Sequence, residues 1–224
     1  MDKAGQVVGV SQIPGFKRVE IQSDGLEIGS LLPGSYIKIR YGNAEEPKYR
    51  SITISKCSVE SFTLDFVDHV NTGLASSLAR EIKIGQEIHF KGPGPASEIA
   101  ATAKATFFYA DPSALPAMNA HLEKINSSCE IHVFFEGADE VLTSYVDVSK
   151  IDWIKDKSKF VAMVKECNFS QTAFWAAGER NEILDLNASL LPHKPEFLSF
   201  YASSYWQTNK ADEEHRLLKK SDPK

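Results

Sequence analysis

The chain has 224 residues, of which 42% are hydrophobic and 25% charged, with a net charge of −5 at pH 7. This balance is typical of a globular protein with a sizeable core, and the acidity excludes general nucleic-acid binding through a basic face. No apolar run approaches the roughly 20 residues of a membrane span, and the first residues lack a signal peptide's basic and apolar regions, so we expect a cytoplasmic protein.

Cysteines and histidines are too dispersed to indicate a metal site. Cys57, Cys129 and Cys167 are far apart, no Cys-x-x-Cys occurs, and no two histidines are four residues apart. We therefore expect neither a disulfide framework nor a zinc or iron–sulfur site. We also expect no catalytic metal held by the protein, and we predict a monomer.

Residues 1–101 are predicted to form a first domain of short strands. Runs of β-branched and aromatic residues alternate with Gly, Pro, Asn and Ser turns. A short helix fits at Gly73–Glu81. Closely spaced strands of this kind favour a closed six-stranded antiparallel barrel. The strands are predicted at Val7–Ile13, Phe16–Gln22, Ser35–Tyr41, Arg50–Lys56, Ser61–Val67 and Glu87–Lys91.

Residues 102–224 are predicted to form a second domain, in which strands alternate with helices. This alternation predicts a parallel sheet with crossover helices, typical of nucleotide-binding α/β domains, and a C-terminal helix. The strands are predicted at Thr106–Ala110, Glu130–Phe135, Thr172–Ala177 and Phe197–Ala202. The helices are predicted at Pro112–Lys124, Lys157–Cys167, Glu179–Leu190 and Lys210–Lys220.

The segment Arg50-Ser51-Ile52-Thr53 enters a predicted strand after a polar loop. Because side chains alternate along a strand, Arg50 and Ile52 share one face and Thr53 takes the other. An arginine can bind a pyrophosphate with two hydrogen bonds, an apolar group can pack on a flat ring, and a hydroxyl can bond the ring edge. The alternative is an amphipathic strand with a solvated arginine.

The next candidate segment runs from Asp65 to Leu78. A strand ends, Thr72-Gly73 forms a turn, and the small residues Ala75 and Ser76 open a helix. Backbone N–H groups at a helix N-terminus form an anion site that suits a diphosphate. Alternatively, Thr72 is an ordinary N-cap.

Three junctions in the second domain follow predicted strands. They are the turn 111–117, Gly178-Glu179, and Tyr205-Trp206. Open α/β sheets bind ligands at the carboxyl ends of their strands, although no Gly-x-Gly-x-x-Gly is present. Adjacent aromatic residues can cover a cofactor ring. The alternatives are strand–turn–helix junctions without a ligand and buried aromatic packing.

Taken in order, these segments resemble the siderophore-interacting protein family of flavin reductases. The family pattern Arg-x-Tyr-Thr, Phe-x-x-His…Gly-x-Ala-Ser, Gly-Pro-x-Gly, Ala-(Leu/Met)-Pro-Ala, Gly-Glu and Tyr-Trp is matched by six segments between Gly34 and Trp206. The matching segments are Arg50–Thr53, Phe66…His69…Gly73–Ser76, Gly92–Pro95, Ala114–Ala117, Gly178-Glu179 and Tyr205-Trp206.

The resemblance implies FAD as cofactor and assigns roles to these residues. Arg50 would contact the FAD phosphates, Thr53 the flavin N5, and Tyr205 and Trp206 the reduction face. The implied FAD-binding set is Arg50, Ser51, Ile52, Thr53, Asp65, Phe66, Val67, His69, Thr72, Gly73, Ala75 and Ser76. Ala114, Leu115, Pro116, Gly178 and Glu179 would meet a nicotinamide donor. Lys38 matches a lysine of the family's basic substrate pocket.

Two departures from the family pattern stand out. Ile52 replaces the flavin-stacking tyrosine, and Gly94 stands where the family often has a basic residue. The pocket would then draw positive charge from elsewhere. Further candidates are Lys48, Lys56, Arg180 and Lys210.

The resemblance implies reduction of a ferric siderophore to release ferrous iron, with electrons from NADH, NADPH or a ferredoxin. Glu136, after the strand ending at Phe135, suits a ribose 2′-hydroxyl better than a 2′-phosphate. Two alternatives stay open: a flavin reductase for another acceptor, and a non-catalytic carrier of ferric siderophore. The predicted helix Lys210–Lys220 is either a solvated terminal helix or a flank of the active site that limits nucleotide access.

Overall fold

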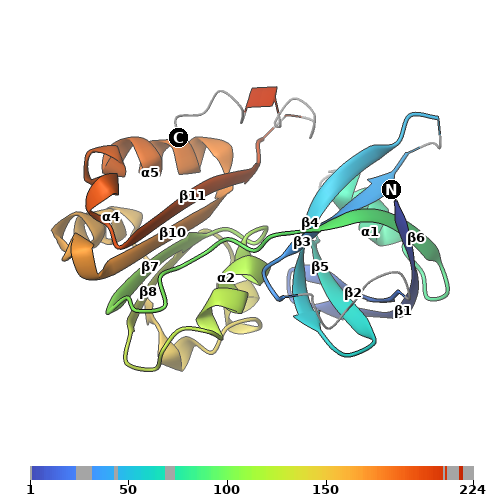
Figure 1. Cartoon of the computed structure of the whole chain (residues 1–224), viewed down its shortest axis with the longest axis horizontal. Coiled ribbons are helices and arrows are strands. Elements are labelled where there is room, and N and C mark those ends of the chain that lie inside the picture. Colours follow the sequence, from blue (N-terminus) through green and yellow to red (C-terminus); the bar gives the residue numbers. More distant parts are fainter. Residues whose placement is uncertain are drawn as a thin grey trace. The chain divides into compact units, whose positions relative to one another are not determined.

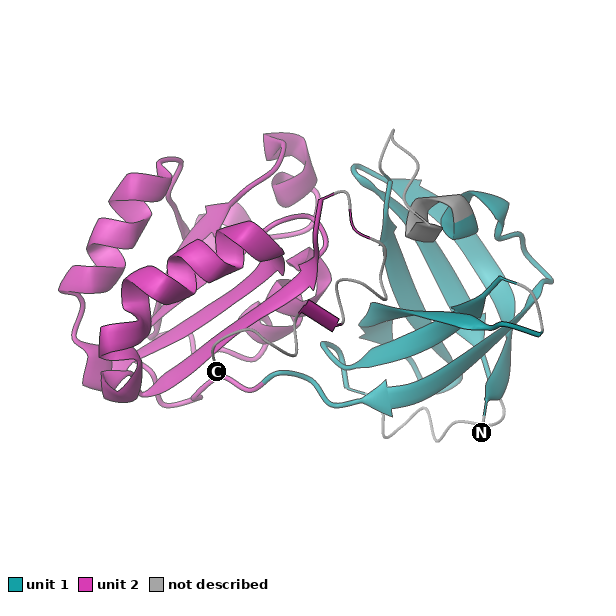
Figure 2. Ribbon diagram, turned by 90° about the horizontal axis from the view of Figure 1, so that it is seen from above, with its two compact units in different colours: residues 1–97 teal, residues 98–224 magenta. Residues whose placement is uncertain are grey.

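The computed structural model describes residues 2–23, 32–42, 45–68, 74–208, 210 and 217–218, and of residues 74–77 only the backbone. The chain divides into two compact units, residues 1–97 and 98–224 (Figure 2). The division falls between residues 97 and 98, and the boundary between residues 101 and 102 stays a prediction from the sequence.

The first unit is a closed antiparallel barrel, as predicted (Figure 1). Around the barrel the strands follow the order β1-β2-β5-β4-β3-β6. Closure pairs every strand on both sides and leaves no sheet edge. The strands are β1 (Lys3–Ile13), β2 (Phe16–Gln22), β3 (Tyr36–Tyr41), β4 (Lys48–Cys57), β5 (Ser61–Val67) and β6 (Glu87–Gly94).

Alternation along the strands fills the barrel interior. Ile37 and Ile39 of β3 are fully buried, and so are Phe62 and Leu64 of β5. Phe62 meets Phe90 of β6 edge to face, with ring centroids 5.6 Å apart. Helix α1 (Leu74–Glu81) follows β5 and adds Ala79 to this core. These residues define the inner face of the wall, and their strand neighbours define the outer face.

The second unit is a five-stranded parallel sheet in the order β11-β10-β7-β8-β9, which confirms the predicted class. Two short elements were missing from the prediction, β9 (Asp152–Trp153) and α3 (Asp139–Thr143), because neither is long enough to carry a periodic pattern. The other strands are β7 (Ala105–Ala110), β8 (Glu130–Phe135), β10 (Thr172–Glu179) and β11 (Ser199–Trp206).

Helices cover both faces of this sheet (Figure 1). Phe107 and Phe174 face Phe160 and Leu186, from α4 and α5, in one core cluster. On the other face, Phe108 and Trp175 contact His121 of α2. The helices are α2 (Leu115–Leu122), α4 (Lys157–Glu166) and α5 (Arg180–Leu190), with 3-10 turns at Val148–Lys150, Phe169–Gln171 and Leu191–Glu196.

The predicted terminal helix Lys210–Lys220 lies largely outside the described residues. Within that range the structure describes residue 210 and the two helical residues Leu217 and Leu218. Among the helices of the described chain, none has the length and apolar character needed to span a bilayer.

Candidate functional site

Three neighbouring strands of the barrel wall align a hydroxyl, an aromatic ring and a glycine. Tyr36 of β3 pairs with Thr53 of β4 on one side and with Gly94 of β6 on the other. Directly paired residues point to the same face, and Thr53 and Tyr36 alternate with the inward-facing Ile54 and Ile37. Thr53, Tyr36 and Gly94 therefore form one row on the outer face, which we call the outer row.

The Tyr36 ring lies directly over Gly94. A Cβ atom built on Gly94 would fall 2.2 Å from Cζ of Tyr36. A bulge in β6 between the pairs Tyr36–Gly94 and Lys38–Lys91 brings Gly94 into this position. Gly92 allows the bulge because its φ of 118° is one that side-chain-bearing residues rarely adopt. Any side chain at residue 94 would compete with the ring for the same space.

Positive charge lies next to the outer row. Lys38, two residues along β3 from Tyr36, pairs with Ser51 on one side and with Lys91 on the other. Lys91 is engaged, because its Nζ lies 3.7 Å from Asp2 Oδ1 and 4.0 Å from the centre of the Tyr49 ring. Lys38 is exposed. The structure thus brings the predicted residues Lys38, Ser51 and Thr53 together on one face.

Arg50 and Ile52 face the other way, as alternation predicts. They pair with the fully buried Ile39 and Ile37. Half-buried Ile52 packs against the barrel core. Burial lowers the pKa of the Arg50 guanidinium, while nearby Tyr41 raises it. A cation that has lost part of its hydration favours an anionic partner such as a phosphate, so Arg50 fits the phosphate-binding role.

Some of the candidates in and after β5 stabilise the barrel, and the others lie outside the described residues. The Asp65 carboxylate is buried and accepts two hydrogen bonds from Arg18, at 2.8 and 2.9 Å. Phe66 fills the barrel core, so only the backbone there can meet a cofactor, next to half-buried Val67. His69, Thr72 and Gly73, and the side chains of Ala75 and Ser76, lie outside the described residues.

In the α/β unit, the strand order reverses between β7 and β10. From β7 the chain continues through β8 and β9 on one side, while β10 and β11 lie on the other. Ligands in open sheets bind at such a switch point, at the carboxyl ends of the strands. Asp111 follows β7 and Gly178 lies near the end of β10, so both lie there.

The Asp111 carboxylate is the centre of this edge. Oδ1 accepts hydrogen bonds from the Ser113 N–H (2.8 Å), the Ser113 hydroxyl (2.6 Å) and the Ala114 N–H (3.2 Å), and Oδ2 accepts one from Trp206 Nε1 (2.6 Å). Gly178, with φ of 151°, passes so close that a Cβ would lie 2.8 Å from Oδ2. Burial raises the Asp111 pKa, while the Ser113 and Trp206 hydrogen bonds lower it.

The remaining candidates at this edge are also buried or hydrogen-bonded within the protein. Ala114, Leu115 and Pro116 are buried, so only their backbone can meet a nucleotide. The Glu179 carboxylate accepts from the N–H groups of Asn181 and Glu182, where it caps α5, and from Thr208 N–H at 3.1 Å. Its side chain therefore holds protein donors in place.

Further acidic and aromatic groups complete the edge. The Tyr109 hydroxyl donates to Glu136, and burial followed by this contact raises the Tyr109 pKa. Burial also raises the Tyr205 pKa, as does its neighbour Tyr201. Asp111, Glu136 and Glu179 thus give the predicted nucleotide edge an acidic character, which opposes additional phosphate charge.

The remaining predicted basic residues are distributed over the barrel and the α/β unit. Lys48 and Lys56 are exposed near the two ends of β4. Half-buried Arg180 is the first residue of α5, and Lys210 is exposed after β11. Lys38 lies two residues along β3 from Tyr36, the direct partner of Thr53, and is in this sense the predicted substrate lysine next to Thr53.

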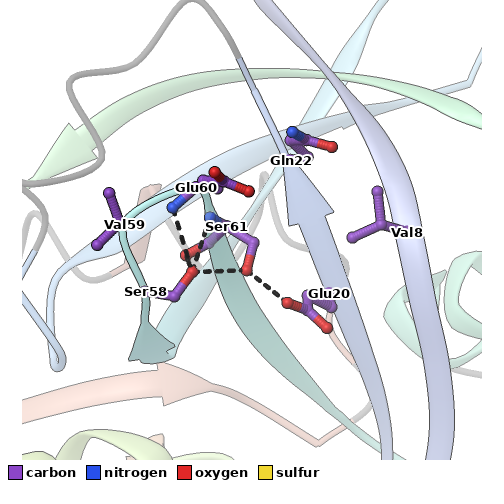
Figure 3. A pocket seen from close by; sticks show the side chains of 7 residues that line it. All are labelled: Val8, Glu20, Gln22, Ser58, Val59, Glu60 and Ser61. Carbon is purple, nitrogen blue, oxygen red and sulfur yellow. Dashed lines mark hydrogen bonds between the residues drawn. The ribbon is translucent and has the colours of Figure 1, made fainter.

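A shallow depression elsewhere on the barrel has different chemistry (Figure 3). Its lining is Val8, Glu20, Gln22, Ser58, Val59, Glu60 and Ser61. The Ser61 hydroxyl donates to Glu20 inside it. Two carboxylates and no basic side chain make it unsuitable for a phosphate, and it contains none of the predicted site residues. No metal-binding group of His, Cys, Asp or Glu side chains occurs within the described parts of the chain.

The sequence predicted no role for Tyr36 or Tyr109, and it indicated Asp111 only as the start of the turn 111–117 and Gly94 only as a departure from the family pattern. Asp111 had a usable signal, because it directly follows a predicted strand and precedes Pro112-Ser113, a common pattern for a carboxylate that bonds the next turn. The contact of Tyr36 with Gly94 joins strands that are far apart in sequence, and local pattern carries no signal for it.

The comparisons agree with this architecture. A model of the siderophore-interacting FAD-binding domain matches residues 22–97, and a model described as siderophore-interacting protein matches residues 103–209. No curated protein matches the chain.

Solved structures share the fold over nearly the whole chain. The siderophore-interacting protein from Acinetobacter baumannii is 18% identical with a TM-score of 0.80, covering 97% of this chain and 95% of that one. SipS from Aeromonas hydrophila is 20% identical with a TM-score of 0.81, covering 98% and 96%. A ferredoxin NADP+ reductase from Neisseria gonorrhoeae is 10% identical with a TM-score of 0.67, covering 92% and 99%. Since the two family models match the barrel and the α/β unit in turn, the chain belongs to the siderophore-interacting protein family.

Proposed function

We propose that this protein is a cytoplasmic, FAD-dependent reductase of ferric siderophores. The observation that carries the proposal is the outer face of the barrel, where exposed Lys38 lies on the same face as Thr53. A cation next to the predicted flavin edge would attract a negatively charged ferric complex. Family membership supports both the flavin and the siderophore.

The cofactor assignment is supported by the chemistry of the barrel. Partly desolvated Arg50 would hold the FAD phosphates, and Thr53 would bond the flavin ring from the outer face. When bound, FAD supplies the redox chemistry, taking electrons in pairs and passing them on singly. The chain itself then has to bind and orient the cofactor and the substrate.

The proposed reaction transfers one electron to each ferric complex. Hard oxygen donors bind ferric iron more tightly than ferrous iron, so reduction releases the metal. A nicotinamide donor gives two electrons and a proton per molecule, so one donor molecule would reduce two ferric complexes. A ferredoxin would deliver its electrons one at a time.

The electron donor is proposed to be NADH or a ferredoxin in preference to NADPH. Asp111, Glu136 and Glu179 lie at the ends of the strands where the nucleotide would bind, and they oppose a 2′-phosphate. The N–H groups of Ser113 and Ala114, the natural ligands for a diphosphate in this turn, already bond Asp111. A nicotinamide dinucleotide would have to compete with Asp111 for these N–H groups, whereas a protein donor would not need them.

The test is an anaerobic stopped-flow titration that follows flavin absorbance. NADH, NADPH and a reduced ferredoxin are offered in turn, followed by a ferric siderophore. We expect bleaching by a donor and recovery on adding the siderophore, with one ferrous ion formed per electron. Recovery with generic acceptors but not with ferric siderophore would favour a flavin reductase for another acceptor. A colourless protein that binds ferric siderophore tightly would favour a carrier.

A further inference from the structure

The family's stacking tyrosine is absent at residue 52, and the barrel offers another aromatic ring on a different strand. Ile52 pairs with fully buried Ile37 and packs against the barrel core. Its side chain therefore points away from the face that carries Thr53. A flavin edge bonded by Thr53 would meet whatever lies next to Thr53 on the outer face.

The residue next to Thr53 on that face is Tyr36. The two are directly paired across β3 and β4, and Cβ atoms of such pairs lie about 4.5–5.5 Å apart. Tyr36 is half-buried, so part of the residue remains accessible to a ligand. A ring of this size beside a hydroxyl can contact a flat heteroaromatic ligand while the hydroxyl bonds the ligand's edge.

Gly94 fixes where the Tyr36 ring lies. A side chain at residue 94 would overlap the ring, because a Cβ there would fall 2.2 Å from Cζ and 2.6 Å from the hydroxyl oxygen of Tyr36. The basic residue that relatives often carry in Gly-Pro-x-Gly is therefore incompatible with this position of Tyr36. Of the two departures from the family pattern, Gly94 thus has a direct structural counterpart in the ring of Tyr36.

We propose that Tyr36, whose ring lies over Gly94, contacts the flavin on the outer face of the barrel beside Thr53, on the opposite face of the wall from Ile52. This inference rests on the proposed function insofar as FAD must bind the barrel. It adds a contact on β3 and an explanation for the glycine on β6.

The experiment measures FAD binding and flavin fluorescence in Tyr36→Leu and Tyr36→Phe. A phenol in contact with a flavin quenches its fluorescence by electron transfer, whereas leucine does not and phenylalanine does so weakly. We expect Tyr36→Leu to bind FAD roughly 2- to 10-fold more weakly, the range for loss of an aromatic pair, with several-fold brighter bound flavin. Tyr36→Phe should keep the affinity within about twofold and lose much of the quenching.

Two further variants distinguish loss of the contact between Tyr36 and the flavin from a general loss of barrel structure. Gly94→Ala should displace the ring, shift both readouts in the same direction as Tyr36→Leu, and add little in the double variant, because both changes remove one contact. The matched control is Tyr49→Leu, on the same outer face but four residues from Thr53 along β4. Circular dichroism confirms that each variant retains the barrel.

The outcomes distinguish this inference from the proposed function. Wild-type protein that takes up no FAD would overturn both. Wild-type protein that binds FAD, with Tyr36→Leu no different from Tyr49→Leu in affinity and fluorescence, would overturn the role of Tyr36 alone. Full additivity of Gly94→Ala and Tyr36→Leu would equally contradict it.

Discussion

The barrel wall and the sheet edge both carry polar candidate residues, but they present them differently. On the barrel, Lys38 and Ser51 are exposed and Thr53 is half-buried along one face of paired strands. At the sheet edge, Asp111 and Glu179 accept hydrogen bonds from the protein's own backbone and from Trp206. The barrel thus presents groups to a ligand, whereas the edge uses its groups to hold its own turns together.

This difference has a consequence for substitution. Changes at the barrel face should alter binding and leave folding intact. Changes at the sheet edge should alter folding and leave FAD binding intact. The variants of Asp111, Arg50 and Lys38 test that contrast.

The largest effect is expected for Asp111→Ala. Four donors lose their acceptor, at about 1 kcal/mol each, so the free energy of unfolding should fall by roughly 4 kcal/mol. Urea unfolding followed by Trp fluorescence measures this change. Asp111→Asn, which keeps an acceptor oxygen, should cost clearly less. Equal stability of Asp111→Ala and wild type, or a selective loss of FAD affinity, would contradict a structural role for the edge.

The next effect is a pH dependence that comes from His121. Burial against Phe108 and Trp175, followed by repulsion from Lys124, lowers the pKa of His121 to about 4. Because the folded pKa lies below the ordinary value of about 6.5, the unfolded chain takes up the proton first as pH falls. The contribution of neutral His121 to the free energy of unfolding is therefore complete above pH 6.5. It is lost as the pH falls towards 4, by about 3 kcal/mol in total.

The measurement is urea unfolding at pH 7 and pH 5 for wild type and for His121→Phe, which keeps an aromatic ring without a titratable group. The loss between the two pH values should shrink in the variant by roughly 2 kcal/mol. An undiminished loss would mean that other groups control acid sensitivity.

Features that depend on residues close together in the sequence were the predictable ones. Alternation and turn residues were enough to predict six barrel strands and the parallel sheet, because one buried face imposes a period of two on each strand. The opposite orientation of Arg50 and Thr53 was predictable for the same reason. Strand β9 and helix α3 were not, since two and five residues are too few to show a period.

The composition of the candidate site was less predictable, because contacts across strands set it. The row Thr53–Tyr36–Gly94 depends on the β3–β4 and β3–β6 registers and on a bulge at Gly92. Similarly, the sequence gives no sign that Asp111 reaches Trp206, nearly the whole α/β unit later in the chain. Residue types indicated a nucleotide turn at 111–117, and only the fold reveals that its N–H groups already have a carboxylate partner.

In the barrel, Arg50→Ala should weaken FAD binding without unfolding the protein. Loss of a charge-assisted contact to a phosphate costs about 1.5–3 kcal/mol, or roughly 10- to 150-fold in dissociation constant. Equilibrium titration of the apoprotein with FAD measures it. The matched control is Arg40→Ala, because Arg40 is an arginine of the same barrel that pairs with Asp2. Equal losses in both variants would remove the special role of Arg50.

The smallest effect is expected for Lys38→Ala, and it should depend on the charge of the substrate. Exposed ion pairs contribute up to about 1 kcal/mol, so the half-saturating concentration of a negatively charged tris-catecholate ferric complex should rise roughly two- to fivefold. A neutral tris-hydroxamate complex should be unaffected, and raising the salt concentration should narrow the difference, because exposed charges are screened.

Lys56→Ala is the matched control for Lys38, since it removes an exposed lysine of β4 that pairs with Thr63 of β5 and not with β3. It should leave the half-saturating concentrations of both complexes unchanged. If Lys56→Ala has the larger effect, the basic pocket lies beside the β4–β5 pair and not beside Lys38. If both complexes weaken equally in Lys38→Ala, the lysine acts through the fold or the flavin and not through the charge of the substrate.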